Sequence, residues 1–248
     1  MPDCHNRAMR VLSLTHERDA GPGVFADAIA AAGAELDEWF RVETDAPPAD
    51  PMGYDAVMTF GSSVHIDQSD AHPWIGAETA LLTEMLERGT PLLGVCLGAQ
   101  LVSAAAGGEP RRARETEIGW YDLEVTDDAA DDPLIGPLAP RFDALEWHRY
   151  ECGPPSHATV LARTPVCVQA FRVGDAAWGI QFHAEVRPAD IERWISEHRQ
   201  GDDEPPGGVD IEAFGAQTRA RMTAWSDLGR ALCGRFLAAA ARPLGAPR

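Results

Sequence analysis

The sequence predicts an α/β fold, with an open, mainly parallel sheet that carries helices on both faces and is followed by a C-terminal helical extension. Three observations lead to this prediction. Short apolar runs alternate with segments of helical spacing over residues 9–108. Of the 248 residues, 45% are hydrophobic, which is enough for a substantial core. The apolar runs are continuous rather than alternating, as is typical of parallel strands buried on both faces.

The N-terminal elements alternate regularly in type. Apolar or β-prone runs predict strands at 9–15, 35–42, 54–60 and 90–96. Helical spacing of apolar residues predicts helices at 23–33, 72–89 and 98–108. Each of these helices reaches a glycine at its end, the residue favoured just beyond a helix terminus. Because parallel strands need such crossover helices, this half of the chain forms the expected parallel sheet.

The second half has a different character, with strands set close together. They are expected at 120–126, 142–148, 158–164, 166–174 and 176–183. The last two flank Gly174 and Asp175, a pair typical of a hairpin turn. A helix that starts at Pro188 is expected over 188–199, followed by a linker at 201–208 and a helical segment at 209–241. We therefore expect an α/β domain at 1–200 and an extension at 201–248 that packs on it.

Composition limits the possible partners and the compartment. The formal net charge is −18, so the chain is poorly suited to bind a nucleic-acid backbone or an anionic membrane surface. No segment approaches the roughly 20 apolar residues of a membrane span, and no signal peptide is recognised. The five cysteines are odd in number and widely spaced, without a C-x-x-C pair. These features predict a cytoplasmic protein with reduced thiols, and no metal site or cofactor is expected.

The stretch Gly-Val-Cys-Leu-Gly, residues 94–98, stands where an expected strand runs directly into an expected helix. A sharp turn there lifts Cys96 above the sheet edge, and the flanking glycines permit the tight backbone. The N-terminus of the following helix favours a thiolate, and the N–H of Leu97 points toward an oxyanion formed on an attacked carbonyl. A cysteine packed in a central strand is the alternative interpretation.

A second stretch, Gln-Phe-His-Ala-Glu at 181–185, ends another apolar run. In an extended segment, positions two apart face the same side, so Glu185 can orient the ring of His183. Cysteine nucleophile, histidine base and orienting carboxylate together form a catalytic triad. A structural histidine at a strand end is the alternative for His183 taken alone.

Together, GVCLGAQ at 94–100 and QFHAEV at 181–186 resemble the class I glutamine amidotransferases, in particular stand-alone relatives of the GMP synthase glutaminase domain. The resemblance covers about residues 9–200 and implies a flavodoxin-like sheet. It implies that Cys96 attacks the side-chain amide of glutamine, that His183 moves the proton and that Glu185 orients His183.

The same resemblance implies further site residues. Gly61 matches a glycine that donates an oxyanion N–H, although the family's Gly-Gly-Pro loop here reads Phe-Gly-Ser. Gln100 matches a substrate-contacting glutamine. Trp147 and His148 lie in a segment whose backbone receives the amino-acid end of glutamine, where the common His-Gly-Asp is replaced by His-Arg-Tyr.

Three functions remain open at this stage. The first is a glutaminase that passes ammonia to a separate synthetase, since no phosphate loop and no room for a second catalytic domain are present. The second is a free-standing hydrolase of another γ-glutamyl amide or peptide, which the altered segment after Trp147 suggests. The third is a non-catalytic regulatory protein on the same fold. A monomer or a homodimer is expected.

Overall fold

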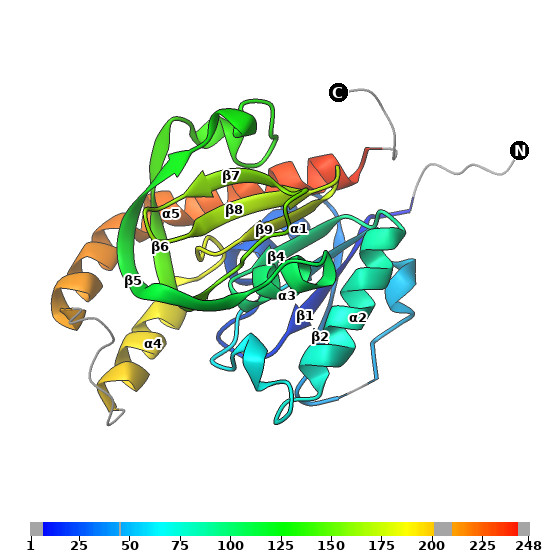
Figure 1. Ribbon diagram of the computed structural model, residues 1–248, viewed down its shortest axis with the longest axis horizontal. Helices are drawn as coiled ribbons and strands as arrows, with labels where there is room; N and C mark the ends of the chain where they lie inside the picture. The colour runs from blue at the N-terminus through cyan, green and yellow to red at the C-terminus, as the bar shows by residue number, and fades with distance from the viewer. Residues whose placement is uncertain (1–6, 45, 201–209, 243–248) are drawn as a thin grey trace, which may run out of the picture.

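The computed structural model describes residues 7–44, 46–200 and 210–242. Its elements form a nine-stranded sheet in the order β2-β1-β3-β4-β9-β8-β7-β5-β6, with helices packed against it (Figure 1). The strands are β1 Arg10–Thr15, β2 Glu35–Phe40, β3 Ala56–Thr59, β4 Leu92–Val95, β5 Arg111–Val125, β6 Arg141–Glu151, β7 Thr159–Arg163, β8 Val168–Val173 and β9 Ala177–Ile180. The α-helices are α1 Gly23–Ala31, α2 Trp74–Glu87, α3 Leu97–Ala105, α4 Pro188–Gln200 and α5 Ile211–Ala240.

The sheet has two halves of different construction. The pairs β2–β1, β1–β3, β3–β4 and β4–β9 are parallel, as the alternation of strands and helices predicts. From β9 onward the neighbours β8, β7, β5 and β6 are antiparallel, so the sheet is mixed. The expected hairpin joins β8 to β9, with Gly174 at φ 57° in its turn. The expected α/β fold is confirmed.

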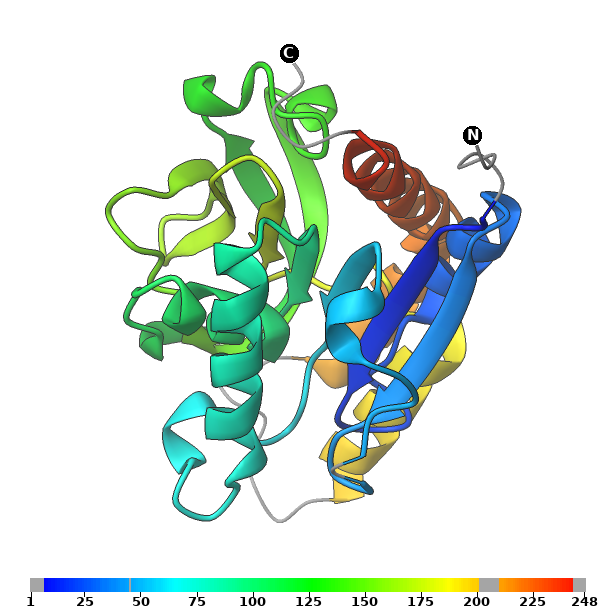
Figure 2. The same ribbon diagram turned by 90° about the vertical axis from the view of Figure 1, so that its right-hand side faces the viewer.

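The helices cover both faces of the sheet, as expected. Helices α2 and α3 pack together on one face, and α1, α4 and α5 pack on the other (Figures 1 and 2). The core accordingly divides into two clusters: Leu82 and Leu101 belong to one, and Phe25, Trp225 and Phe236 belong to the other. Burial of these faces supplies the main driving force for folding, about 25 cal/mol for each Å² of apolar surface.

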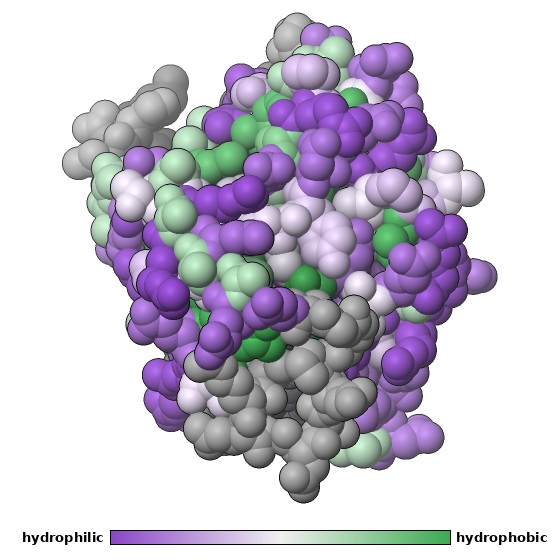
Figure 3. All heavy atoms as spheres, turned by 90° about the vertical axis from the view of Figure 1, so that its left-hand side faces the viewer, coloured by the Kyte–Doolittle hydropathy of each residue, from purple (hydrophilic) through white to green (hydrophobic). Residues whose placement is uncertain are grey.

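Helix α5 is one continuous element of 30 residues. Its N-terminus is capped by Asp210, whose carboxylate accepts hydrogen bonds from the N–H groups of Glu212 and Ala213 at 3.0 Å each. Its apolar side contacts α1, and Trp120 of β5 donates a 3.0 Å hydrogen bond to Thr218. Purple, hydrophilic residues dominate the face of the molecule next to α4 and α5, with smaller green areas between them (Figure 3). In the described ranges, no helix combines the length and apolarity required to cross a bilayer.

Candidate active site

Cys96 occupies the sharp junction between β4 and α3. Its φ of 54° and ψ of −112° make it the one non-glycine residue with positive φ within 7–44, 46–200 and 210–242. Such a backbone costs about 1–3 kcal/mol and persists only where surrounding contacts enforce it. The enforcing contacts include a 2.9 Å hydrogen bond from the Cys96 N–H to the carbonyl of Ile180, just at the end of β9.

The glycines beside Cys96 are required by close backbone approach. A side chain at Gly94 would collide with the carbonyl of Gly98, and one at Gly98 would collide with the carbonyl of Thr59. Gly98 also donates a 3.1 Å hydrogen bond to the carbonyl of Phe60. The small residues around Cys96 therefore allow α3 to pack against the end of β3. This agrees with the tight turn at Cys96 that the sequence predicts.

His183 lies three residues beyond β9, and Glu185 orients it. Because β9 pairs with β4, with Ile180 opposite Val95, the chain leaves both strands at the same sheet edge. The Nδ1 atom of His183 lies 2.8 Å from Oε1 of Glu185. Both side chains are buried, with 3% and 1% exposure. The spacing of two residues thus gives the hydrogen bond that the sequence predicts.

The electrostatic surroundings of His183 favour its protonated form. Burial alone lowers the pKa of this imidazole, but the Glu185 carboxylate and the Cys96 sulfur together raise that pKa well above its usual value. A hydrogen bond with the Cys96 sulfur contributes to the same effect. The group is therefore arranged to take a proton from a thiol and to hold it close to the sulfur.

Gly61 lies beside both His183 and Cys96. A side chain built on Gly61 would stand 3.4 Å from Cε1 of His183 and 3.9 Å from Sγ of Cys96. Leu97 is the first residue of α3, where helix N–H groups have no partner within the helix. The structure therefore brings Gly61, Leu97, Cys96 and His183 to one place, as the sequence predicts.

A buried charged network lies under the Gly61 loop. Glu78 of α2 is fully buried and contacts Nε2 of His16 at 3.0 Å and Nε of Arg41 at 3.3 Å. Its other oxygen accepts a 2.7 Å hydrogen bond from Thr59. Nδ1 of His16 lies 3.3 Å from the carbonyl oxygen of Gly61. Sequence reasoning missed this network, because 62 residues separate His16 from Glu78 and a glutamate within a helix is usually exposed.

Gln100 reaches toward the end of β6, where the segment of Trp147 and His148 lies. Its Nε2 donates to Oε1 of Gln181 at 3.3 Å and to the carbonyl of Tyr150 at 3.5 Å. His148 directs Nδ1 to the same carbonyl at 2.9 Å. The predicted substrate-binding residues Gln100 and His148 therefore converge on the main chain of Tyr150.

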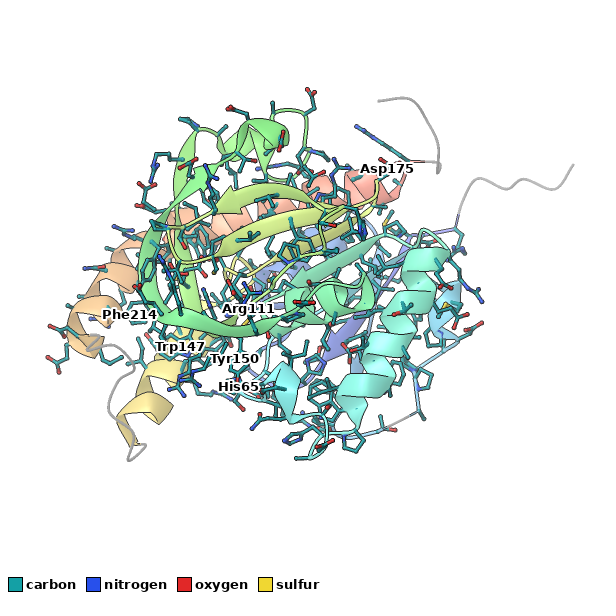
Figure 4. The ribbon with its side chains drawn as sticks, viewed as in Figure 1. His65, Arg111, Trp147, Tyr150, Asp175 and Phe214 are labelled. Carbon is teal, nitrogen blue, oxygen red and sulfur yellow. The ribbon has the colours of Figure 1, made fainter. Side chains whose placement is uncertain are left out.

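Trp147 faces an aromatic cluster instead. Its ring centre lies 5.7 Å from the rings of both Trp194 and Phe214, and Figure 4 shows Trp147 next to Phe214. Trp194 in turn packs edge-on against His183, with ring centres 4.9 Å apart. The Trp147 side chain therefore packs against Trp194, the residue that contacts the ring of His183.

Tyr150 joins β6 to the loop that follows Gly61. Its ring stacks on His65 with centres 4.3 Å apart. Both side chains are labelled in Figure 4, where they lie near each other. Its hydroxyl donates a 2.7 Å hydrogen bond to Asp67, a bond that also raises the pKa of the tyrosine. Tyr150 therefore ties the end of β6 to the loop that follows Gly61.

Helices α1 and α5 contact the backbone of the segment that carries His183 and Glu185. Trp225 of α5 donates a 2.7 Å hydrogen bond from Nε1 to the carbonyl of His183. The N–H of Val24 in α1 donates to the carbonyl of Glu185 at 2.7 Å. Gly229 of α5 lies so close to the carbonyl of Ala184 that a side chain would collide with it. The sequence predicts the helices but gives no sign of these contacts.

The fold and the arrangement of Cys96, His183 and Glu185 define a class of protein, a cysteine-containing α/β protein with the geometry of an amidohydrolase. The sequence profile of the family Glutamine amidotransferase class-I matches residues 25–197, and the chain belongs to this family. Family membership implies hydrolytic activity on glutamine or related amides.

Several relatives are similar to the chain at moderate identity. The glutamine amidotransferase-like protein YfeJ of Salmonella typhimurium is 27% identical over 224 residues, covering 88% of this chain and 91% of that protein. A gamma-glutamyl-L-1-hydroxyisopropylamide hydrolase of a Pseudomonas species is 30% identical over 55% of this chain and 49% of its own length. A glutamine-hydrolyzing GMP synthase subunit of Sulfolobus acidocaldarius is 38% identical over 39% of this chain and 52% of its length. The chain thus spans about half of the last two relatives.

Solved structures share the fold. A glutamine amidotransferase from Thermotoga maritima superimposes with a TM-score of 0.83 and 24% identity, covering 94% of this chain and 99% of the other. A second, from Methylobacillus flagellatus, has a TM-score of 0.82 and 22% identity over 95% and 96% of the two chains. This likeness confirms the flavodoxin-like α/β fold that the sequence predicts.

Proposed function

We propose that the chain hydrolyses the γ-amide of glutamine, with Cys96 as the nucleophile. The observation that carries this proposal is the strained backbone of Cys96, which is held beside Gly61 and the hydrogen-bonded pair of His183 and Glu185. A non-glycine residue held at positive φ in a buried turn is the mark of a backbone kept for chemistry rather than for stability.

In the proposed reaction, the Cys96 proton passes to His183 and the sulfur attacks the amide carbon. The negative charge on the carbonyl oxygen is stabilised by the N–H groups of Gly61 and Leu97. His183 then protonates the departing nitrogen, the C–N bond breaks and ammonia leaves a γ-glutamyl thioester on Cys96. Water gives its proton to His183 and attacks the thioester, so that glutamate is released and the thiol is restored.

For the substrate's amino-acid end, we propose the pocket near Gln100 and the main chain that follows Trp147 and His148. The convergence of Gln100 and His148 on the carbonyl of Tyr150 supports this location. Similarity to the glutamine-hydrolyzing GMP synthase of Sulfolobus acidocaldarius supports a separate synthetase as the ammonia acceptor. The extension at 201–248 then acts as a support of the α/β domain, in a cytoplasmic monomer or homodimer.

A glutaminase assay of the full chain tests the proposal. Glutamate and ammonia should form in equal amounts, and Cys96→Ser should lower kcat by about 10³-fold or more because a hydroxyl is a far poorer nucleophile beside this base. Cys233→Ser is the matched control, since Cys233 is also buried but hydrogen-bonds to Phe25 on the far face. Equal activity of wild type and Cys96→Ser would refute the role of Cys96.

A second candidate, hydrolysis of a larger γ-glutamyl amide, is favoured by Tyr150. Tyr150 contacts His65 and Asp67 in the segment after Trp147, where the sequence departs from the common His-Gly-Asp of the resemblance. Similarity to the Pseudomonas gamma-glutamyl amide hydrolase supports this candidate as well. A panel of γ-glutamyl amides separates the two by kcat/KM: a preference for free glutamine of 10-fold or more supports the first (about 1.4 kcal/mol). Turnover of no amide, together with no labelling of Cys96 by a glutamine-like electrophile, would instead indicate a non-catalytic protein.

A further inference from the structure

A buried group of metal-ligand atoms lies where β5, β6 and the start of β8 come together, and it includes neither Cys96 nor His183. Glu117 of β5 stands directly opposite His148 of β6 in the strand register. Cys167, next to the start of β8, points at the same place. One ligand atom from each of these three residues lies within 4.8 Å of the other two. All three are buried, with exposures of 1%, 4% and 8% for Glu117, His148 and Cys167.

His148 is held in the orientation of a metal-binding histidine. Its Nδ1 faces the carbonyl of Tyr150 at 2.9 Å, so this nitrogen carries a proton and donates it. An Nδ1–H bonded to a backbone carbonyl is the usual partner of an imidazole that ligates through Nε2. Nε2 then faces Glu117 and Glu146, each at 3.3 Å.

The distances from Nε2 of His148 to the two carboxylates are longer than those of direct charged hydrogen bonds. A charged N–H···O bond is about 2.7–2.9 Å long, and Nε2 of His148 makes no bond of acceptable geometry in the described residues. In tetrahedral zinc, bonds of about 2.0–2.2 Å to nitrogen and oxygen separate those ligand atoms by about 3.3–3.5 Å. The observed separation of Nε2 from Glu117 is 3.3 Å.

The distance between the Cys167 sulfur and Glu117 agrees with the same geometry. A zinc–sulfur bond of about 2.3 Å places sulfur about 3.5–3.7 Å from an oxygen ligand. Sγ of Cys167 lies 3.7 Å from Oε2 of Glu117, the same oxygen that faces His148. Gln169 donates a 2.7 Å hydrogen bond to this oxygen and so fixes the carboxylate, as an outer partner of a ligand does.

Glu146 supplies a further reason to expect a cation. It is fully buried, and neither of its carboxylate oxygens has a hydrogen-bond partner in the described part of the chain. Once Cys167 loses its proton, two carboxylates and one thiolate surround one imidazole, and a divalent cation offsets two of their three negative charges. The mixture of sulfur, nitrogen and oxygen ligands is one that zinc accepts, whereas calcium and magnesium prefer oxygen alone.

We propose that Glu117, His148 and Cys167 bind one Zn²⁺ ion, with Glu146 as the adjacent carboxylate that completes its surroundings. Binding displaces the proton on Nε2 of His148 and the thiol proton of Cys167, and both are released to solvent. The site fastens β5, β6 and β8 to one another behind the segment of Trp147 and His148. It departs from the sequence-based expectation of no metal, and it does not depend on which amide the enzyme cleaves.

Metal analysis of the untagged full chain tests the proposal. After removal of metal by a chelator and addition of Zn²⁺, about one ion per chain should remain through gel filtration. Co²⁺ should bind with the visible bands of a four-coordinate ion and a thiolate-to-cobalt charge-transfer band. In Cys167→Ser the charge-transfer band should vanish, and in Glu117→Gln the affinity should fall by 10-fold or more.

The matched control is Cys233→Ser, in which a buried cysteine on helix α5 is changed and the cobalt spectrum should stay the same. Circular dichroism of every variant establishes that it is folded before titration. A folded wild-type chain that retains no Zn²⁺ and gives no Co²⁺ spectrum overturns the proposal. Uptake that is identical in wild type and Cys167→Ser overturns it as well, since the metal would then lie elsewhere.

Discussion

Trp225 offers a direct test of whether helix α5 supports the reacting groups. In Trp225→Phe the 2.7 Å hydrogen bond to the carbonyl of His183 is lost, and that buried oxygen is left without its donor. An unsatisfied buried acceptor costs about 1–3 kcal/mol. The ring pairs that Trp225 makes with Trp120 at 5.3 Å and Phe182 at 6.2 Å are also weakened, each by up to about 1 kcal/mol.

The expected loss of unfolding free energy is therefore about 1–5 kcal/mol, measured by urea denaturation. Because the lost bond holds the main chain of His183, we also expect kcat to fall by about 10–100-fold, with a smaller change in KM. Both quantities are measured on the same purified variant, under conditions in which it is fully folded.

Trp39→Phe is the control for this experiment. Trp39 also donates from Nε1 to a backbone carbonyl, that of Thr44 at 2.9 Å, but it lies on β2, away from His183. Its loss should cost about 0.5–1.5 kcal/mol of stability and leave kcat unchanged. If Trp225→Phe keeps both its stability and its kcat, or if the two variants lose kcat equally, the reasoning that links α5 to His183 is wrong.

Three further predictions concern the reacting groups. Cys96→Gly should be more stable than Cys96→Ala by about 1–2 kcal/mol in thermal unfolding. Both variants lack the sulfur, but only glycine adopts a positive φ without strain. Equal stability of the two variants would mean that the backbone is unstrained. Gly98→Ala should lose stability and most activity, since its side chain collides with the carbonyl of Thr59; wild-type kcat would contradict this. Glu185→Gln removes a charge that raises the pKa of His183. The stabilisation of the folded protein by the protonated His183 beside this charge is complete below about pH 6.5, and it is lost as pH rises through the raised pKa. Its loss of stability in urea should therefore be larger at about pH 6 than at about pH 9, and the reverse order would refute the assignment.

The candidate site could be predicted from the sequence where its determinants are local. The turn at Cys96 depends on glycines two residues to either side, and the pair His183–Glu185 depends on a spacing of two in an extended segment. Both patterns are visible in a short stretch of chain, and the structure agrees with both.

Features that depend on pairing between distant segments could not be predicted. Strand β5 begins at Arg111, although the sequence indicates a strand only from Trp120, because the charged stretch before it is held by pairing with β6. Glu78 lies in a helix with ordinary spacing, and only the fold reveals that it faces His16 and Arg41. Contacts of this kind leave no periodic signal in the sequence.

The contact between Trp225 and His183 has a consequence for the order of synthesis. The ribosome completes Cys96, Gly61 and the His183–Glu185 pair before it adds any residue of α5. A nascent chain therefore carries Cys96 and His183 for a period in which the carbonyl of His183 lacks its hydrogen bond from Trp225. We expect the growing polypeptide to remain a poor amidohydrolase until α5 docks, so that catalytic competence is acquired late in translation.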